Sequence, residues 1–326
     1  MRKPSKQIQT AQLPARRLQP RQTGKNFFRR LGREFPYHAM VWLGLLFVLI
    51  FNYIPMPGII IAFKDYGIRD GIWHSPWVGL KWFKEMFSDY FVRNALLNTV
   101  GISVLSLCIS FPLTILFALL LNELQNKILQ RTVQTISFLP HFISWAVMAV
   151  ILTALLSPSD GILSGFLTKI GLLDEMTYIM GDPKYYWIMV VLAGLWKEYG
   201  WNSIVYLAVL SGVDSTLYEA ARIDGASRWQ QIRHISLPAL KGIISITLIL
   251  RIAGCIGSGF EQAFYLSNAL NYERSNVLAY YTYQVGLANV NFSYSTAIGL
   301  VFSLIGSGMM LAGNAIVKKI NGEGIY

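Results

Sequence analysis

Charged residues, cysteines and catalytic signatures are all scarce in this chain of 326 residues. Charged side chains make up 14% of it, against about 25% in a typical soluble domain. The two cysteines have no Cys-X-X-Cys spacing and so indicate neither a redox nor a metal role. This composition excludes an ordinary soluble domain and favours a chain that is mostly surrounded by lipid.

Motifs for covalent chemistry are also missing. The sequence contains no GxxxxGK[ST], no GxSxG and no HExxH, and its four histidines are scattered through different segments. We therefore expect a chain that is not an enzyme and holds no cofactor. Any use of ATP, with its magnesium ion, would have to take place on another protein.

Long apolar runs, by contrast, are abundant. Hydrophobic residues make up 54% of the chain and the mean hydropathy is +0.44. Runs of roughly 18 to 25 residues can cross about 30 Å of hydrocarbon as helices, and continuous apolar runs favour helices over a barrel. The sequence predicts an all-α membrane protein with six transmembrane helices, at residues 38–62, 95–121, 133–156, 186–212, 239–265 and 293–317.

Basic residues are unevenly distributed along the chain. Residues 1–37 contain ten Lys or Arg against one acidic residue, Glu34, whereas the three loops expected outside contain eight basic and nine acidic residues. Because Lys and Arg concentrate in cytoplasmic segments, we expect both termini in the cytoplasm. This distribution also explains the pI of about 9.6 without a nucleic-acid partner.

The two ends of the chain lie outside the expected transmembrane domain at 38–320. Residues 1–25 are rich in Gln, Arg and Pro and lack apolar periodicity, so a disordered basic tail is expected. Residues 26–37 mix aromatic side chains with arginines, as an interfacial helix on membrane lipids would, although a merely solvated stretch fits equally well. Residues 321–326 form a short cytoplasmic tail.

A polar, helix-prone insert separates the fourth and fifth apolar runs. Asp214 or Ser215 can cap a first helix, Gly225 permits a sharp change of direction, and a second helical stretch runs from about Ser227 until Pro238 stops it. The loop 213–238 is therefore predicted to be a helix, a turn and a helix on the cytoplasmic surface. On these features alone, an ordinary cytoplasmic loop remains an alternative.

The order and spacing of this insert resemble the EAA motif of permease subunits of bacterial ABC importers: Glu219-Ala220-Ala221, then Asp224-Gly225-Ala226, then Ile235, Leu237 and Pro238. NALLNTV at 94–100 resembles carbohydrate-uptake permeases. SFLPHFISWAV at 137–147 and the stretch 192–214 are similar to the branch that handles complex oligosaccharides. Ile232 departs from the pattern, since many relatives have an aromatic residue there.

The resemblance implies a type I ABC importer permease fold with a cytoplasmic coupling helix, in the bacterial inner membrane. It also implies partners: a second homologous permease subunit, two ATPase subunits that bind ATP and magnesium, and an extracytoplasmic solute-binding protein. The residues expected to contact or shape the ATPase docking surface are Glu219, Ala220, Ala221, Asp224, Gly225, Ala226 and Arg228.

Polar groups at membrane depth are costly unless they are paired or functional, so they are candidates for a substrate pathway. Lys197 and Glu198 lie about half-way along the fourth run and Arg251 near the middle of the fifth. Either these groups neutralise one another, or a surplus cation remains for an acidic sugar. The other candidates are Trp145, Trp196, Asn202 and Tyr206, with Trp201, Glu261 and Gln262 nearby.

The outer loops at 64–93 and 157–185 are long enough to dock a binding protein. We expect an oligosaccharide or polysaccharide cargo, with an acidic one such as alginate favoured and a neutral oligosaccharide as the alternative. An ion-coupled secondary sugar carrier would more often show internal repeats. A membrane-embedded polysaccharide-modifying enzyme would need clustered catalytic groups. The sequence shows neither feature clearly.

Overall fold

The computed structural model describes residues 25–174 and 177–321, and apart from one isolated bridge between Lys64 and Trp77 this part of the chain is helices and connecting loops. The described chain divides into two compact units, which meet between Gly58 and Ile59. The predicted all-α class is confirmed.

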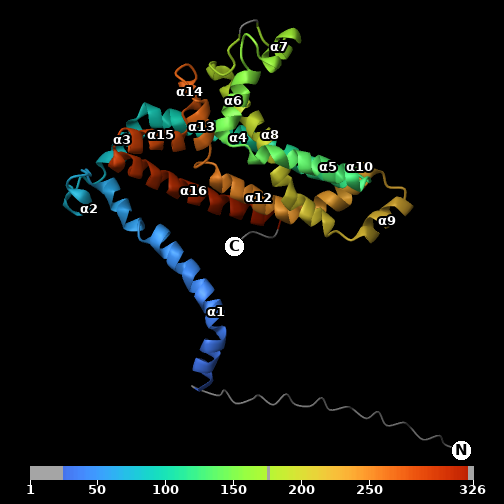
Figure 1. Ribbon diagram of the computed structural model, residues 1–326, viewed down its shortest axis with the longest axis horizontal. Helices are drawn as coiled ribbons and strands as arrows, with labels where there is room; N and C mark the ends of the chain where they lie inside the picture. The colour runs from blue at the N-terminus through green and yellow to red at the C-terminus, as the bar shows by residue number, and fades with distance from the viewer. Residues whose placement is uncertain (1–24, 175–176, 322–326) are drawn as a thin grey trace, which may run out of the picture. The chain divides into compact units, whose positions relative to one another are not determined.

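The first unit is one long helix. α1 (Lys25–Val48) continues into a π-helical turn at Leu49–Tyr53, so the expected interfacial stretch at 26–37 and the start of the first apolar run share a single helix (Figure 1). Within the apolar helical segment Tyr37–Phe63, only 6% of an 18-residue stretch is buried by other parts of this chain. Of the predicted tails, residues 1–24 and 322–326 lie outside the described residues.

The helices are consistent with about six membrane spans. Three are long and apolar enough to cross a bilayer: Tyr37–Phe63, Tyr90–Asn122 and Phe292–Lys319. Three further pairs of helices reach the same length and hydropathy only if each bent pair counts as one span, the bends being 101°, 73° and 61°. The predicted six spans are consistent with this arrangement, and the third and fifth apolar runs are not single continuous helices.

The third apolar run is broken in its middle. α5 (Lys127–Phe138) leads into a 3₁₀ turn at Leu139–Phe142, and α6 (Trp145–Leu155) leaves at 101°. Pro140 lacks the N–H that an α-helix needs at this position. Ser144 has extended backbone angles and its Oγ accepts from the Val147 N–H, so it starts a new helix.

The fifth apolar run is also interrupted. α12 (Lys241–Gly254) ends where glycines become frequent, and α13 (Phe260–Leu266) starts after Gly259, whose φ is +88°. Glycine is disfavoured in helix interiors and tolerates positive φ. Pro238 does not end the preceding helical stretch: it lies inside α11 (Leu237–Ala239), after a π-helical turn, and the chain bends two residues later.

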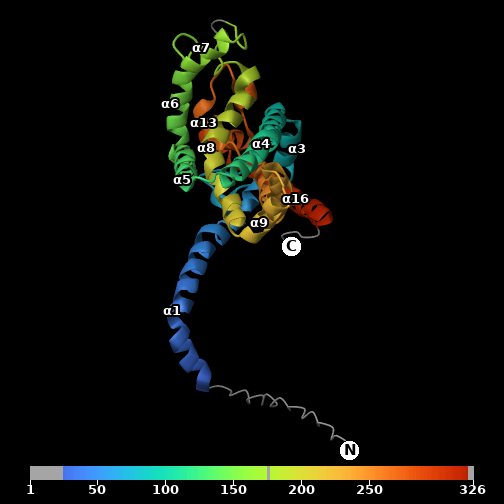
Figure 2. The ribbon, with the colours of Figure 1, turned by 90° about the vertical axis from the view of Figure 1, so that its right-hand side faces the viewer.

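The second unit is built around two helix pairs. α4 (Tyr90–Asn122) packs along α8 (Pro183–Ser211), and α12 packs along α16 (Phe292–Asn321), as Figures 1 and 2 show. α5 lies against α8 so closely that a Cβ on Gly200 would be 2.0 Å from the Ser137 carbonyl oxygen. Small residues permit such close approach between helices in membranes.

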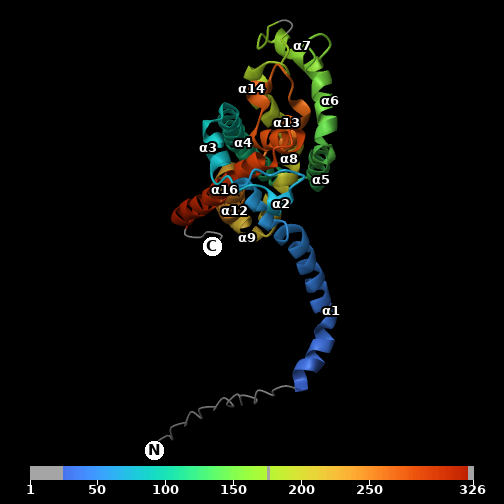
Figure 3. The same cartoon turned by 90° about the vertical axis from the view of Figure 1, so that its left-hand side faces the viewer.

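Shorter helices complete the second unit. They are α2 (Gly71–His74), α3 (Lys81–Ser88), α7 (Ile162–Lys169), α9 (Ser215–Ile223), α10 (Arg228–Gln231), α14 (Tyr272–Ser275) and α15 (Leu278–Tyr283), with π-helical turns at Ile232–Ser236 and Gln284–Ala288. Figures 2 and 3 place α7 and α9 at opposite ends of this unit. We refer to these as the α7 end and the α9 end.

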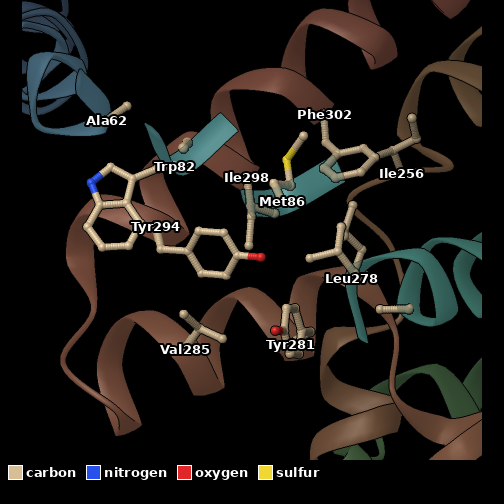
Figure 4. Close-up of a cluster of buried hydrophobic side chains, with 13 residues drawn as sticks. Ala62, Trp82, Met86, Ile256, Leu278, Tyr281, Val285, Tyr294, Ile298 and Phe302 are labelled. Carbon is tan, nitrogen blue, oxygen red and sulfur yellow. The ribbon is translucent and has the colours of Figure 1, made fainter. Parts of the chain in front are cut away.

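One carboxylate joins three of these elements. Asp89 caps α4 through the Phe91 N–H, and its other oxygen accepts from the hydroxyls of Tyr281 and Tyr294, each at 2.7 Å. The two rings lie in the apolar cluster of Figure 4, on α15 and α16. Burial opposes ionisation of Asp89, but these hydrogen bonds outweigh it and hold the pKa of Asp89 below its usual value.

Candidate functional site

A cavity of about 460 Å³ opens between α4, α8 and α12. The wall from α8 consists of residues three or four apart, among them Val191, Glu198 and Asn202, which is the spacing of one helix face. α4 supplies hydroxyl groups, and Trp145 of α6 and Gln262 of α13 complete the lining. Glu198 and Arg251 are its two charged residues. Such a cavity, mostly apolar with a few polar groups, is a typical ligand site.

Glu198 is fully engaged by neighbouring groups. Its Oε1 lies 3.3 Å from the Lys197 Nζ, and its Oε2 lies 2.9 Å from the Nδ1 of His141. Lys197 also donates to the backbone carbonyl of His141, and the His141 ring stacks on Trp201 at 4.3 Å between centroids. This network holds the corner between α5 and α6 against α8. It also balances the charge of Glu198 within the protein.

Arg251 is in a different position. Its side chain is half-buried and lines the cavity, yet it makes no hydrogen bond or ion pair with any other residue in the described part of the chain. A desolvated cation without a partner is costly. Of the two alternatives left open above, Lys197 and Glu198 do pair, and the surplus cation is Arg251.

The cavity brings together about half of the expected pathway residues. Trp145, Glu198, Asn202, Arg251 and Gln262 line it. The remaining candidates do not. Lys197 is buried against His141, Tyr206 is buried with its hydroxyl 3.0 Å from the Thr247 hydroxyl, Trp196 and Trp201 are 46% and 43% exposed outside the cavity, and Glu261 is exposed on α13.

The sequence reasoning missed some lining residues and one partner. His141 is one of the four histidines scattered through the sequence, and no motif distinguishes it, yet it contacts Glu198. Tyr199 and the α4 hydroxyls of Ser103, Ser106 and Ser110 also line the cavity. The recurring small and hydroxyl residues of α4 at intervals of three or four could have indicated a polar face. Nothing in the sequence pairs His141 with α8, because that contact depends on the broken third span.

The α9 end has the predicted helix, turn and helix. Asp214 accepts from the Thr216 N–H and caps α9, and Ser227 caps α10 through a reciprocal capping box with Gln230. Hydrogen bonds from the Thr216 N–H and hydroxyl lower the pKa of the Asp214 carboxyl. Each cap satisfies amide groups that a helix start leaves without partners. This local structure follows directly from the residues of the insert.

The turn between α9 and α10 depends on Gly225. The Ala226 N–H bonds the Ala221 carbonyl, and the Gly225 N–H bonds the Arg222 carbonyl, which together form a Schellman ending for α9. Gly225 has φ +76°, and no atom lies within 4 Å of where its Cβ would be. Glycine is therefore required by the backbone conformation and leaves open space on the surface.

The outer surface of α9 and α10 is unusually apolar. Leu217, Ile223 and Trp229 are 52%, 87% and 64% exposed. The docking surface predicted from the sequence consisted of small and charged residues, so it did not include these three. Ile232, the departure from the motif, is buried in a cluster with Phe111 and Tyr206 and so anchors this end to α4 and α8.

The predicted coupling residues divide between two surfaces. Glu219 and Arg228 line a second cavity of about 250 Å³, formed with the chain between Asn122 and Lys127 at the end of α4. Ala220, Asp224 and Gly225 are exposed, and Ala221 and Ala226 are half-buried in the turn. The set therefore lies together at the α9 end, but Glu219 and Arg228 face the loop after α4 of the same chain.

Comparison with known proteins adds family information to this geometry. Residues 110–322 match the family described as binding-protein-dependent transport system inner membrane component. Protein LplB of Bacillus subtilis (strain 168) is 37% identical over 303 residues, 93% of this chain and 95% of LplB. The polygalacturonan/rhamnogalacturonan transport system permease protein YteP of the same organism is 39% identical over 289 residues, 89% of either chain.

Solved structures give the same result for the fold. A chain of a bacterial ABC transporter involved in the import of the acidic polysaccharide alginate superimposes with a TM-score of 0.82 and 34% identity, covering 91% of this chain and all of that chain. A second structure contains the bacterial alginate ABC transporter in complex with a periplasmic protein bound to an alginate pentasaccharide, and matches with the same TM-score over 92% of this chain.

Proposed function

Since this chain belongs to the family of binding-protein-dependent transport system inner membrane components, and is thus the permease of a sugar ABC importer rather than an enzyme, we propose that its cargo is an acidic oligosaccharide or polysaccharide. The cargo would pass through the cavity between α4, α8 and α12. A neutral oligosaccharide is the alternative cargo. The charge of the residues in the same cavity is the feature that would favour one cargo over the other.

The observation that supports an acidic cargo is the contrast between Arg251 and Glu198. Glu198 has Lys197 and His141 as partners, whereas Arg251 has no ionic partner in the described chain and lines the cavity. With the buried Lys197 behind the wall offsetting Glu198, the charge left for a ligand in the cavity is that of Arg251. A carboxylate on a sugar would form a charge-assisted pair with the guanidinium and offset its desolvation.

One similar protein and one similar structure support this choice of cargo. One carries polygalacturonan and rhamnogalacturonan in its name, and the matching structure is that of an importer of an acidic polysaccharide. Both cargoes are those of the similar proteins. For this chain they support the same chemical class, and the unpaired arginine supplies an independent physical reason.

The α9 end is the surface that we propose for the ATPase subunits. Its exposed Leu217, Ile223 and Trp229 could enter a groove of a partner, and two helix caps and the Gly225 turn keep its shape. In this assembly the α9 end and both termini face the cytoplasm of a bacterium. Two ATPase subunits hold ATP and magnesium there, and a second homologous permease completes the pathway.

The α7 end then faces the solute-binding protein. α7 lies at the far end of the second unit from α9 (Figures 2 and 3), and it exposes Ile162 and Phe166 at 80% and 57%. A periplasmic protein is part of one matching structure. Exposed apolar groups on a projecting segment are typical of a docking surface.

Uptake by the reconstituted complex tests the acidic cargo. We expect Arg251→Gln to lower uptake of acidic oligosaccharides about 10- to 100-fold while neutral oligosaccharides of equal length change less than about twofold, because a charge-assisted pair contributes about 1.5–3 kcal/mol. Arg251→Lys should recover part of the loss. Arg131→Gln, at an exposed arginine on α5, is the matched control. Equal losses for acidic and neutral cargo would contradict the proposal.

A further inference from the structure

Five aromatic rings form a continuous surface on α13 and α15. Phe260 and Phe264 of α13 lie 5.3 Å and 5.8 Å from the ring of Tyr283, and Tyr280 stacks on Tyr283 at 6.5 Å with an interplanar angle of 13°. Tyr265 joins through Phe264 at 5.0 Å. We call these five residues the aromatic platform. Figure 1 shows α13 and α15 next to each other.

The aromatic platform is exposed rather than packed into the core. Phe264 and Tyr265 are 42% and 45% exposed, and Phe260, Tyr280 and Tyr283 are partly exposed. The buried side of α13 consists instead of Ala263 and Leu266, and Leu266 belongs to the core around α6 and α8. The rings therefore contact one another but leave an open aromatic face.

The hydroxyl groups of this surface have no partners in the part of the chain that the structure describes. Within residues 25–174 and 177–321, Tyr265, Tyr280 and Tyr283 form no hydrogen bond through their hydroxyls. Their neighbours differ: Tyr272 donates to Gln284 and Tyr281 to Asp89. Flat apolar rings combined with free hydroxyls match the two sides of a sugar, whose ring face carries C–H groups and whose edge carries hydroxyls.

The aromatic platform is continuous with the cavity. Successive residues of a helix are about 100° apart, so Gln262, Tyr265, Glu261 and Phe264 follow one another around the open side of α13. Gln262 lines the cavity, as does Gly259 immediately before Phe260. A chain of sugars that leaves the cavity along α13 would therefore reach Tyr265 and then Phe264.

We propose that the aromatic platform is a second sugar-binding site, on which pyranose rings of an oligosaccharide stack before or while the leading residues occupy the cavity. This inference rests on the proposed function as a sugar permease. Glu261 is the charged residue in this part of α13 and it is acidic. Stacking on the aromatic platform therefore contributes affinity for the sugar ring, independent of its charge, whereas Arg251 selects for the carboxylate.

The length of the cargo provides the test. A disaccharide is short enough to be held by the cavity alone, whereas a pentasaccharide extends beyond it. In proteoliposomes containing the whole complex and its binding protein, we expect Phe264→Leu to raise the KM for a pentasaccharide roughly two- to tenfold and to leave the disaccharide nearly unchanged. The probes are alginate or polygalacturonate oligosaccharides, whichever series the wild-type complex takes up.

Matched variants separate stacking from packing. Phe264→Leu keeps an apolar side chain and removes the aromatic face, Phe264→Trp restores a larger one and should recover the pentasaccharide KM, and Tyr283→Phe removes only a hydroxyl and should give a smaller loss. Phe47→Leu removes an aromatic ring that is 65% exposed on α1 and should change nothing.

Three results would overturn the inference. One is an equal KM change for both lengths, another is no change for the pentasaccharide, and the third is loss of subunits from the purified Phe264→Leu complex, which would identify the surface as a subunit interface. The Arg251 comparison is read separately, because it depends on cargo charge and this one on cargo length. Either proposal can fail while the other holds.

Discussion

The α9 end and the cavity are built in opposite ways. At the α9 end, each feature comes from residues within a few positions of one another, such as the Asp214 and Ser227 caps and the Gly225 turn. In the cavity, the decisive contacts join residues far apart in sequence, such as His141 with Glu198, 57 positions away. Local chemistry thus produces an exposed surface, and tertiary packing produces an enclosed one.

The difference predicts how each region responds to added atoms. A change at the α9 end should alter coupling to partners while the rest of the protein stays folded. A change in the helix contacts around the cavity should destabilise the whole second unit.

Gly200→Ala should have the largest effect. Its Cβ would meet the Ser137 carbonyl oxygen at 2.0 Å, where backbone cannot move aside easily, so α5 and α8 would have to separate at a cost of about 3 kcal/mol or more. Thermal unfolding of the detergent-solubilised protein should show a strongly lowered Tm. Gly194→Ala, on the same helix with nothing within 4 Å, should be close to wild type. Equal Tm values for the two variants would disprove the contact.

Gly225→Val should abolish transport without unfolding the protein. A β-branched residue at φ +76° is strained by about 1–3 kcal/mol and its side chain projects into the open space of the turn. We expect a loss of more than tenfold in ATP-driven uptake with a change of only a few degrees in Tm. Asparagine adopts left-handed backbone angles more readily than other non-glycine residues, so Gly225→Asn should retain most activity. If Gly225→Val instead lowered Tm as much as Gly200→Ala, the α9 end would not be locally built.

Lys197→Met should show that the cavity charges are coupled. Removing the ammonium leaves Glu198 with only His141, and we expect a loss of about 2–3 kcal/mol, reduced from the fully buried case because Glu198 is 35% exposed. Adding Glu198→Gln should recover part of this stability. A double-mutant cycle measured by denaturation gives the coupling energy. Strictly additive losses would contradict the pairing of Lys197 with Glu198.

Asp89→Asn should have the smallest effect and depend on pH. The pKa of Asp89 in the folded state is below its ordinary value of 3.8, so its stabilisation is complete above about pH 5 and is lost as the pH falls through the lowered pKa. The wild type should lose stability on acidification to about pH 3, whereas the variant, about 1–2 kcal/mol less stable at neutral pH, should lose less. Parallel pH profiles of Tm would argue against the role of Asp89.

Asp89 takes part in both local and long-range interactions. As a residue that caps α4, it could be read from the sequence just before an apolar run. Its hydrogen bonds to Tyr281 and Tyr294, about 200 positions later, could not. The same carboxylate therefore contributes to local helix formation and to the joining of α15 and α16.

The sequence alone determined what depends on composition and on neighbouring residues. Apolar runs gave the helical membrane class and the number of spans, and the cap residues, Gly225 and the motif spacing gave the shape of the α9 end and the family. Hydropathy and helix capping depend on residues within one segment, so they can be predicted without knowing how the rest of the chain packs. Hydropathy does not show that the third and fifth spans are broken, because an apolar run has the same hydropathy whether straight or bent; Pro140, Ser144 and Gly259 permit the breaks, and the tertiary structure shows the angles that result.

Tertiary structure also decided the charge of the cavity. Lys197, Glu198 and Arg251 are equally conspicuous in the sequence, yet packing places His141 and Lys197 on Glu198 and leaves Arg251 without an ionic partner in the described chain. The aromatic platform likewise exists only because α13 and α15 pack together. Electrostatic pairing and ring contacts act over a few ångströms, so they depend on which helices become neighbours and not on the order of residues.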